Sequence, residues 1–209
     1  MAPNYKENYV NGVVICHGKS EWLMAKHISS NLHLRVKPYA KDKGKYSIQI
    51  TALKKLLTSK PFNRQSAFVA EYPVEEVGKG KNKRLENFKL FIIMDTDDCT
   101  EQQKKDYLSR KMFEGHWLHD YIVPIVNIPN LEEVLTEVGM MPKKIRDDEK
   151  GEYYAKVFPV NNKPLSDDTL KEVLTLRDFV NKSRNTNLPE YIDYCLSLLP
   201  NNKDQTKQT

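Results

Sequence analysis

The sequence predicts an α/β fold, in which a largely parallel sheet of about four strands is flanked by helices and followed by a helical C-terminal extension. Three observations support this prediction. Short apolar runs alternate with segments of helical spacing over roughly the first two thirds of the chain. The runs at residues 13–16 and 88–94 are almost wholly apolar, as in strands buried on both faces. Each run also ends abruptly in polar residues, as strands do where open α/β sheets bind ligands.

Four segments are predicted strands. Residues 13–16 and 88–94 are continuous apolar runs, residues 34–40 alternate between apolar and polar side chains, and residues 122–128 are again mostly apolar. Because helical segments separate these runs, we expect βαβ units and parallel pairing.

Four helices are predicted between and after these strands. The first begins at Ser20, and the second covers residues 47–57 and ends before Pro61. The third begins with Thr100 as its cap and runs toward Gly115. The fourth is short, is capped by Asn130 and stops at residue 139.

The remaining chain is more irregular. A strand is predicted at residues 153–160, followed by helices that begin at Ser166 and at Pro189, a residue favoured in the first turn of a helix. The expected organisation is an N-terminal arm (1–10), an α/β domain (11–140) with a basic insertion at 66–84, a mainly helical extension (141–200) and a disordered tail (201–209).

Composition favours a cytoplasmic protein. The net charge of +5 permits nucleic acid as a partner without requiring it. The 3 cysteines show no paired spacing, which favours a reducing compartment. We expect neither a secretory signal nor a membrane span, because the first residues are polar and every apolar run is short.

The acidic residues after the 88–94 run are the strongest functional signal. Asp95 and Asp97 are alternate residues of an extended segment, so both can face one ligand, with Asp98 beside them. If the first and third predicted strands lie in one sheet, Glu21 joins these carboxylates, and hard divalent cations prefer such oxygen ligands. We therefore predict a site for Mg²⁺ or Mn²⁺. The alternative is a polar loop in which Asp98 or Thr100 caps the next helix.

The turn after the first predicted strand holds a histidine and a Gly-Lys-Ser sequence. A phosphate-binding loop would need a glycine five residues before Gly18, where Val13 stands, so we interpret the segment as a tight strand-to-helix turn. His17 could be a metal ligand, a general base or a phosphate contact, or it could bond a neighbouring loop. His116 and His119 are interpreted as ordinary loop residues.

Three lysine-rich groups could contact a phosphate backbone. Any one of them alone is better interpreted as a solvated surface, and phosphate contact is favoured only if all three line the edge that holds the carboxylates. They lie at residues 41–45, 79–84 and 143–146. The candidate nucleic-acid contacts are Lys19, Lys79, Lys81, Lys83 and Arg84.

Together, the two motifs resemble the Toprim domain, which occurs in topoisomerases, bacterial primases, OLD-family nucleases and small defence-associated proteins such as the RloB-like group. The resemblance covers residues 11–139. The sequence VICHGKSE at residues 14–21 is similar to the VEGKSE form of the first Toprim motif, and residues 93–98 match the DxD motif. The resemblance implies a Rossmann-like sheet and a magnesium-dependent reaction on nucleic acid.

One departure from the Toprim pattern concerns acid–base chemistry. The family's motif glutamate, its proposed general acid/base, is replaced by His17. Three alternatives are open: His17 takes over proton transfer, Glu21 supplies the missing carboxylate, or the site is degenerate.

Two functional hypotheses follow. The first is a metal-dependent phosphodiesterase or nuclease, for which the resemblance implies a role in phage defence. In this hypothesis Asp95, Asp97, Asp98 and Glu21 hold the metal, and His17, Glu21 and Asp95 are catalytic. The second is a catalytically silent Toprim-like module that binds a partner protein or nucleic acid. The sequence alone leaves the choice between DNA and RNA open.

Overall fold

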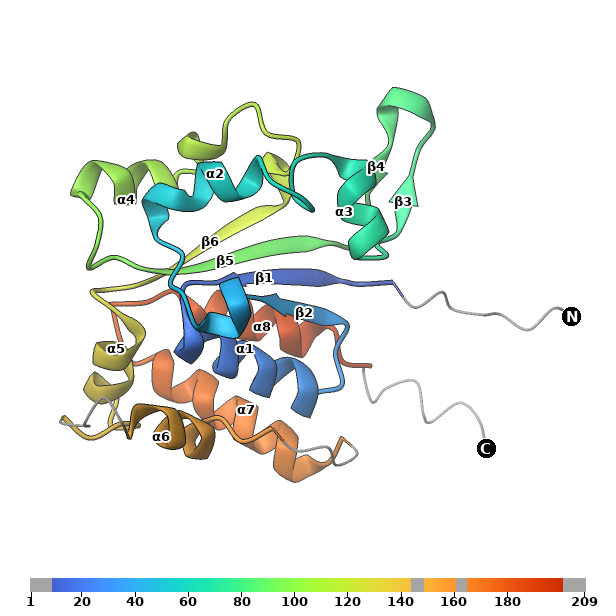
Figure 1. Ribbon diagram of the computed structural model, residues 1–209. Helices are drawn as coiled ribbons and strands as arrows, with labels where there is room; N and C mark the ends of the chain where they lie inside the picture. Colours follow the sequence, from blue (N-terminus) through green and yellow to red (C-terminus); the bar gives the residue numbers. More distant parts are fainter. Residues whose placement is uncertain (1–8, 144–148, 161–164, 201–209) are drawn as a thin grey trace, which may run out of the picture.

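The computed structural model describes residues 9–143, 149–160 and 165–200 and has an α/β architecture (Figure 1). A sheet of 4 strands has the order β2-β1-β5-β6, and every neighbouring pair is parallel. The predicted fold class is therefore confirmed.

All four predicted sheet strands are present. They are β1 (Gly12–Cys16), β2 (Val36–Tyr39), β5 (Lys89–Asp95) and β6 (Ile122–Asn127). In the β1–β5 register Cys16 lies opposite Ile93, and in the β5–β6 register Asp95 lies opposite Asn127. The carboxyl ends of the three strands thus meet at one edge of the sheet, on the left in Figure 1.

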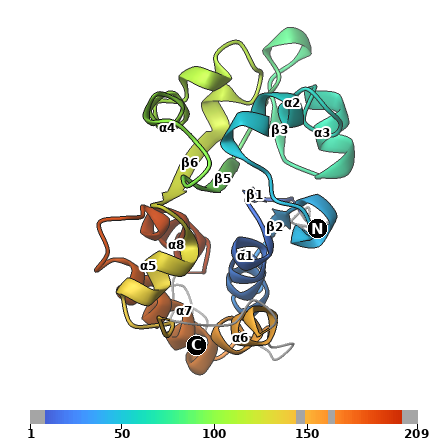
Figure 2. The same ribbon diagram turned by 60° about the vertical axis from the view of Figure 1, so that its left-hand side comes forward.

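Helices cover both faces of the sheet (Figure 2). One face packs against α1 (Lys19–Asn31), α5 (Leu131–Glu137), α6 (Lys150–Val157), α7 (Asp167–Val180) and α8 (Leu188–Ser197). The other face packs against α2 (Leu53–Leu57), α3 (Gln65–Glu71) and α4 (Glu101–Leu108). Side chains of β1 alternate between these layers, with Val14 on the first face and Val13 and Ile15 on the second. The C-terminal helices therefore share a core with the sheet.

Polar caps account for several of the helix starts. The side chains of Thr100, Asn130 and Ser166 each accept a hydrogen bond from a backbone N–H in the first turn of α4, α5 and α7. Pro189 lies in the first turn of α8, as predicted. The prediction for α1 was wrong by two residues, because Gly18 and not Ser20 is the N-cap.

Three further element predictions need correction. Residues 153–157 of the predicted strand belong instead to the helix α6, and Phe158 is its C-cap; Tyr154 and Phe158, four residues apart, stack and face the core. The predicted helix at 47–57 begins later, with the 3₁₀ turn η2 (Ile50–Ala52) followed by α2. The helix predicted to run from Thr100 toward Gly115 already ends at Leu108, because a left-handed Arg110 and the 3₁₀ turn η4 (Lys111–Phe113) follow.

The segment predicted as a basic insertion at 66–84 contains structure of its own. It begins in α3, whose Phe68 is fully buried, and continues into the antiparallel hairpin of β3 (Glu76–Val77) and β4 (Arg84–Leu85). The hairpin leads directly into the first residues of β5 and therefore lies at the amino edge of the sheet, on the right in Figure 1.

The remaining predictions concern the ends of the chain, the cysteines and membrane segments. Residues 1–8 and 201–209, and with them most of the predicted arm and the whole predicted tail, lie outside the described residues. Cys16, Cys99 and Cys195 are free thiols. Within the described ranges, no helix has the length and apolar character that crossing a membrane requires.

Candidate functional site

The predicted residues of the two motifs meet at the carboxyl edge of the sheet. His17 directly follows β1, and its backbone N–H donates to the carbonyl of Ile93 in β5 at 2.9 Å. Asp95 is the last residue of β5 and Glu21 lies in the first turn of α1. Parallel pairing thus brings two segments more than seventy residues apart in sequence to one place.

Glu21 is fully buried at the N-terminal end of α1. Its Oε2 accepts a hydrogen bond of 2.8 Å from the backbone N–H of Gly18, and its Oε1 accepts one of 3.1 Å from the Ser20 hydroxyl. The bond from Gly18 is the one that a capping box makes between the side chain of the third helical residue and the backbone N–H of the N-cap. An acidic side chain is favoured at that position. The side chain is therefore held rigidly at the base of the site.

Asp95 is also buried, and two donors hold one of its oxygens. Its Oδ1 accepts from the side-chain N–H of Asn127 and from the backbone N–H of Leu131, each at 3.2 Å. Asn127 is itself oriented by Thr186, whose hydroxyl donates to Asn127 Oδ1 at 3.0 Å. Asn127 was not predicted as a site residue, although its position after the apolar residues of β6 is the same signal that singled out Asp95.

Burial and neighbouring charges change the acidity of both carboxyl groups. The pKa of Asp95 is raised to about 9, chiefly by burial and then by the charge of Glu21, while the bonds from Asn127 and Leu131 act in the opposite direction. The pKa of Glu21 is raised by burial and is lowered again by backbone hydrogen bonds and by the nearby His17. The ionised pair is thus costly on its own, and a cation between the two groups would relieve that cost.

Two further polar atoms in the cluster are buried and have no hydrogen-bond partner among the described residues. They are Nδ1 of His17 and Oδ1 of Asp98. Burial raises the pKa of the Asp98 carboxyl, and the nearby His17 lowers it. Asp97 is exposed and contributes to the raised pKa of Asp95. Buried polar atoms without partners are uncommon in native structures and are consistent with a ligand or water in this cluster.

The donor set fits a hard cation that also takes oxygen ligands from water and substrate. Within the part of the chain that the structure describes, no three His, Cys, Asp or Glu side chains form a ready-made metal centre. Mg²⁺ seldom uses such a cage, however, and is usually held by one or two carboxylates, with waters and substrate phosphates completing the octahedron. Asp95 and Glu21 can provide the two carboxylates.

One wall of the site comes from the loop after β2, which the sequence did not single out as part of the site. The backbone N–H of Ile48 donates to the carbonyl of His17 at 2.7 Å. Gly44 packs so closely on α1 that a Cβ at this position would lie 2.6 Å from Cα of Lys19. Gln49 bonds to the Asp98 side chain and lowers its pKa.

Tyr154 approaches the same cluster from α6. Its side chain is buried, and its pKa is raised by burial and by the nearby carboxylates of Glu132 and Glu21. Tyr154 was missed because residues 153–160 were predicted to be a strand and were not connected with the site.

The predicted nucleic-acid contacts do not all lie near the carboxylates. Lys19 is exposed in the first turn of α1, next to Gly18. Lys79, Lys83 and Arg84 belong to the β3–β4 hairpin at the opposite edge of the sheet, and Lys81 lies in the 3₁₀ turn of that hairpin, η3 (Gly80–Asn82). Lys83 pairs with Glu76 at 3.3 Å. Of the third basic group only Lys143 is described, because residues 144–148 lie outside the described ranges.

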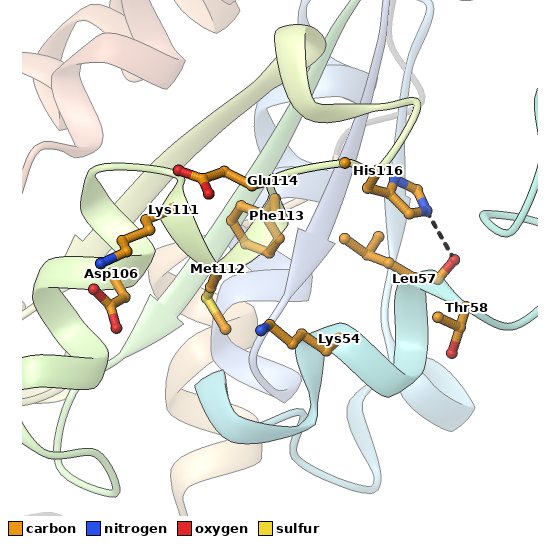
Figure 3. Close-up of a pocket in the computed structure, with 10 residues that line it drawn as sticks. Lys54, Leu57, Thr58, Asp106, Lys111, Met112, Phe113, Glu114 and His116 are labelled. Atoms are coloured by element: carbon orange, nitrogen blue, oxygen red, sulfur yellow. Dashed lines mark hydrogen bonds between the residues drawn. The ribbon is translucent and has the colours of Figure 1, made fainter.

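The two loop histidines do not form a joint site. His116 lines a pocket of about 620 Å³ between α2 and η4, and Figure 3 shows its ring directed toward the Leu57 carbonyl, 3.2 Å from Nε2. His119 instead pairs with Asp120 at 3.0 Å. The residues before Gly18 form β1, which leaves no room for the loop that a P-loop requires.

Comparison with known proteins identifies no relative. No protein-family model, no curated protein and no solved structure matches the chain.

Proposed function

We propose that the protein is a metal-dependent phosphodiesterase that cleaves nucleic acid, with a Toprim-like arrangement of its acidic residues. The observation that carries the proposal is the pair of buried carboxylates at the carboxyl edge of the sheet, Glu21 in the first turn of α1 and Asp95 at the end of β5. A fold gains no stability from two such charges in proximity, so their placement favours a cation-binding role.

The residues of the cluster divide into those that hold the cation and those that move protons. Asp95 and Glu21 would hold Mg²⁺ or Mn²⁺, with Asp97 and Asp98 assisting from the segment after β5. When bound, the cation would supply Lewis-acid stabilisation of the negative charge on a phosphoryl oxygen.

His17 is the candidate for proton transfer. Its side chain is partly buried, interacts electrostatically with Glu21 and with Asp98, and has Nδ1 without a partner among the described residues. A histidine so placed can take a proton from the attacking water and return it to the leaving oxygen. This proposal assigns to His17 the role that the motif glutamate has in the Toprim pattern. A role in phage defence is proposed on that resemblance alone.

The test is a cleavage assay with the purified protein and end-labelled single- and double-stranded DNA and RNA. We expect cleavage with Mg²⁺ or Mn²⁺, none with EDTA, and loss of cleavage in Asp95→Ala. The matched control is Asp120→Ala, because the Asp120 side chain is 91% exposed and lies outside the site. Absence of cleavage on every substrate, together with unchanged biological activity of Asp95→Ala, would refute the proposal.

A second candidate is a catalytically silent module that binds nucleic acid or a partner protein. It is favoured by the internal hydrogen bonds of the carboxylates, because both Glu21 oxygens and Asp95 Oδ1 already accept bonds from the protein. Calorimetric titration with Mg²⁺ and Mn²⁺ separates the two candidates, since a silent site gives no heat that depends on Asp95. In addition, His17→Glu should raise activity in a degenerate site and lower it in a functional variant.

A further inference from the structure

Two aromatic side chains beside the carboxylate cluster each lie among lysines. The ammonium groups of Lys19 and Lys26 lie 5.8 and 5.1 Å from the centre of the Trp22 ring. Those of Lys41 and Lys45 both lie 5.5 Å from the centre of the Tyr46 ring. Tyr46 is 51% exposed, so its ring is accessible from solvent.

The two groups adjoin each other and the site. Lys41 begins the 3₁₀ turn η1 (Lys41–Gly44), which lies against α1 in both ribbon views, where it is drawn in light blue (Figures 1 and 2). Gly44 rests on the backbone of Lys19, so η1 meets the first turn of α1, which also holds Glu21. Tyr46 follows η1 by two residues, and Trp22 directly follows Glu21.

The surface continues from Trp22 away from the carboxylates. A groove of about 480 Å³ lies between α1 and β2, and the described residues that line it include Lys26, Lys37 and His33 but no carboxylate. Val36 and Pro38 of β2 and Ser29 and Ser30 of α1 also line this groove. Aromatic rings, lysines and hydroxyls are the groups that contact bases and phosphates in single-strand binding proteins.

The turn is held in an unusual conformation. Asp42, Lys43 and Gly44 follow one another with φ values of 48°, 53° and 86°. Consecutive residues in the left-handed conformation raise the free energy of the backbone unless other contacts compensate. The packing of Gly44 on α1 is such a contact. The lysines of the turn and Tyr46 are thus presented by a fixed backbone, which reduces the entropy lost on binding.

We propose that this strip, defined by Tyr46, Lys41, Lys45, Lys19, Trp22 and Lys26, binds single-stranded nucleic acid and leads it into the carboxylate cluster. When the strand binds, its bases stack on the Trp22 and Tyr46 rings. The lysines whose ammonium groups lie over these rings in the free protein then pair with the phosphates. The bases of a duplex are stacked on one another and are not free to stack on the two rings. An acidic peptide would pair with the lysines but has no bases to stack on the rings. The proposal deepens the proposed function, on which it rests, by naming the substrate class.

The experiment measures binding in EDTA, where no cleavage occurs, by fluorescence anisotropy of labelled oligonucleotides of about 12 residues, a length typical of single-strand sites. We expect single strands to bind more tightly than duplexes of the same sequence, and the affinity to fall steeply with added salt. Tyr46→Ala should weaken single-strand binding about tenfold, whereas Tyr46→Phe, which keeps the ring, should bind like the wild type.

Two further variants separate charge and packing from stacking. The double variant Lys41→Ala/Lys45→Ala should reduce both the affinity and its salt dependence, while Lys182→Ala should not. Lys182 is the matched control because its ammonium also lies over an aromatic ring, 4.4 Å from the centre of the Phe179 ring, at the end of α7 and outside the strip. Trp22→Leu keeps the apolar packing of this position on the core, and unchanged far-UV circular dichroism would show that its expected loss of binding is not unfolding.

The outcomes distinguish this inference from the proposed function. Equal binding of single strands by the wild type and Tyr46→Ala overturns the inference, even if the protein cleaves nucleic acid. Binding that prefers duplexes, or an acidic peptide over oligonucleotides, overturns it as well. If stacking-dependent binding is found without any metal-dependent cleavage, the inference stands and the proposed function fails.

Discussion

Asp95 is the residue whose surroundings most constrain the chemistry of the site. One of its oxygens is fixed by Asn127 and by the start of α5, while burial and the charge of Glu21 raise its pKa to about 9. In the absence of a cation, a pKa raised in this way keeps a proton on Asp95 of the folded protein, whereas the unfolded chain releases that proton near the ordinary aspartate pKa of 3.8.

This difference predicts how the stability of the metal-free protein depends on pH. The folded state binds the extra proton between about pH 4 and pH 9, so the stability contributed by Asp95 falls as pH rises through that window. Asp95→Asn removes the titrating group, and its melting temperature in EDTA should fall less between about pH 5 and pH 9 than that of the wild type. Asp120→Asn is the control, and melting curves of Asp95→Asn that parallel the wild type would contradict the assignment.

His17 should affect the reaction more than the cation site. Replacing it with Gln removes proton transfer, for which losses of about 100-fold or more are typical, while leaving Glu21 and Asp95 in place. We therefore expect His17→Gln to lose cleavage and to keep the rise in melting temperature that Mg²⁺ causes in the wild type. His119→Gln provides a loop histidine outside the site. A His17→Gln protein with wild-type cleavage would exclude His17 as the acid/base.

From the sequence, single residues of the site could be predicted only where a titratable side chain lies shortly after a predicted strand. Asp95 and His17 stand out because each follows an apolar run directly. Asn127 follows β6 in the same way but is uncharged, and Tyr154 reaches the cluster only through the packing of a helix that the sequence did not predict. Such contacts depend on tertiary structure and leave no local pattern.

Among the secondary-structure elements, the turn η1 owes its position against α1 to a single residue, Gly44. Gly44 has φ +86° and lies so close to Lys19 that a methyl group would meet the backbone of α1. Gly44→Ala should therefore combine backbone strain of about 1–2 kcal/mol with a steric clash and displace the wall of the site.

A matched glycine separates these two effects. Gly115 has a similar φ of +79°, but nothing lies within 4 Å of a Cβ built there. Urea denaturation should show a larger loss of unfolding free energy for Gly44→Ala than for Gly115→Ala, and only Gly44→Ala should weaken cleavage. Equal losses in the two variants would mean that the packing of η1 on α1 contributes little.

Helix starts were predictable because their caps are local. Thr100, Asn130 and Ser166 bond to the helix that each begins, within three residues along the chain. The helix α6 was predicted wrongly because its aromatic residues, Tyr153, Tyr154 and Phe158, also fit a strand pattern. Only their packing on α1 and the sheet selects the helix, since both Tyr154 and Phe158 belong to the core on that face.

In the molecule as a whole, the C-terminal helices complete the layer that α1 begins. His27 of α1 is buried against the segment between α6 and α7, with Nδ1 2.6 Å from the carbonyl oxygen of Pro159 and Asn31 beside it. Burial lowers the pKa of His27 below its ordinary value of 6.5, which the carbonyl of Pro159 and the charge of Glu172 partly offset.

The docking of these helices should therefore weaken in acid. Below about pH 6.5 the unfolded chain takes up a proton that folded His27 resists, so stability falls as pH decreases from that value toward the lowered pKa. Replacing His27 with Asn should make the melting temperature less sensitive to acid, even if it lowers stability at neutral pH. A variant that loses as many degrees as the wild type between neutral and mildly acidic pH would contradict this role.

The parallel pairing of the strands and the meeting of the two motifs at the carboxyl edge of the sheet were predicted from the sequence, because strands that alternate with helices pair in parallel, whereas the order β2-β1-β5-β6 was not predicted. The positions of the two lysine-rich groups relative to the site could not be predicted from the sequence. The 79–84 group looked equivalent to the 41–45 group, yet the hairpin carries the first to the amino edge while Gly44 holds the second against α1.

The most direct test of the cation site is a crystal structure of the protein soaked in Mn²⁺, with anomalous scattering used to locate the metal. The account predicts an anomalous peak at the carboxyl edge of the sheet, within coordination distance of Asp95 and Glu21 and next to His17, which is absent in crystals of Asp95→Asn. Wild-type crystals in saturating Mn²⁺ with no peak between these carboxylates, or with the same peak in Asp95→Asn, would contradict it.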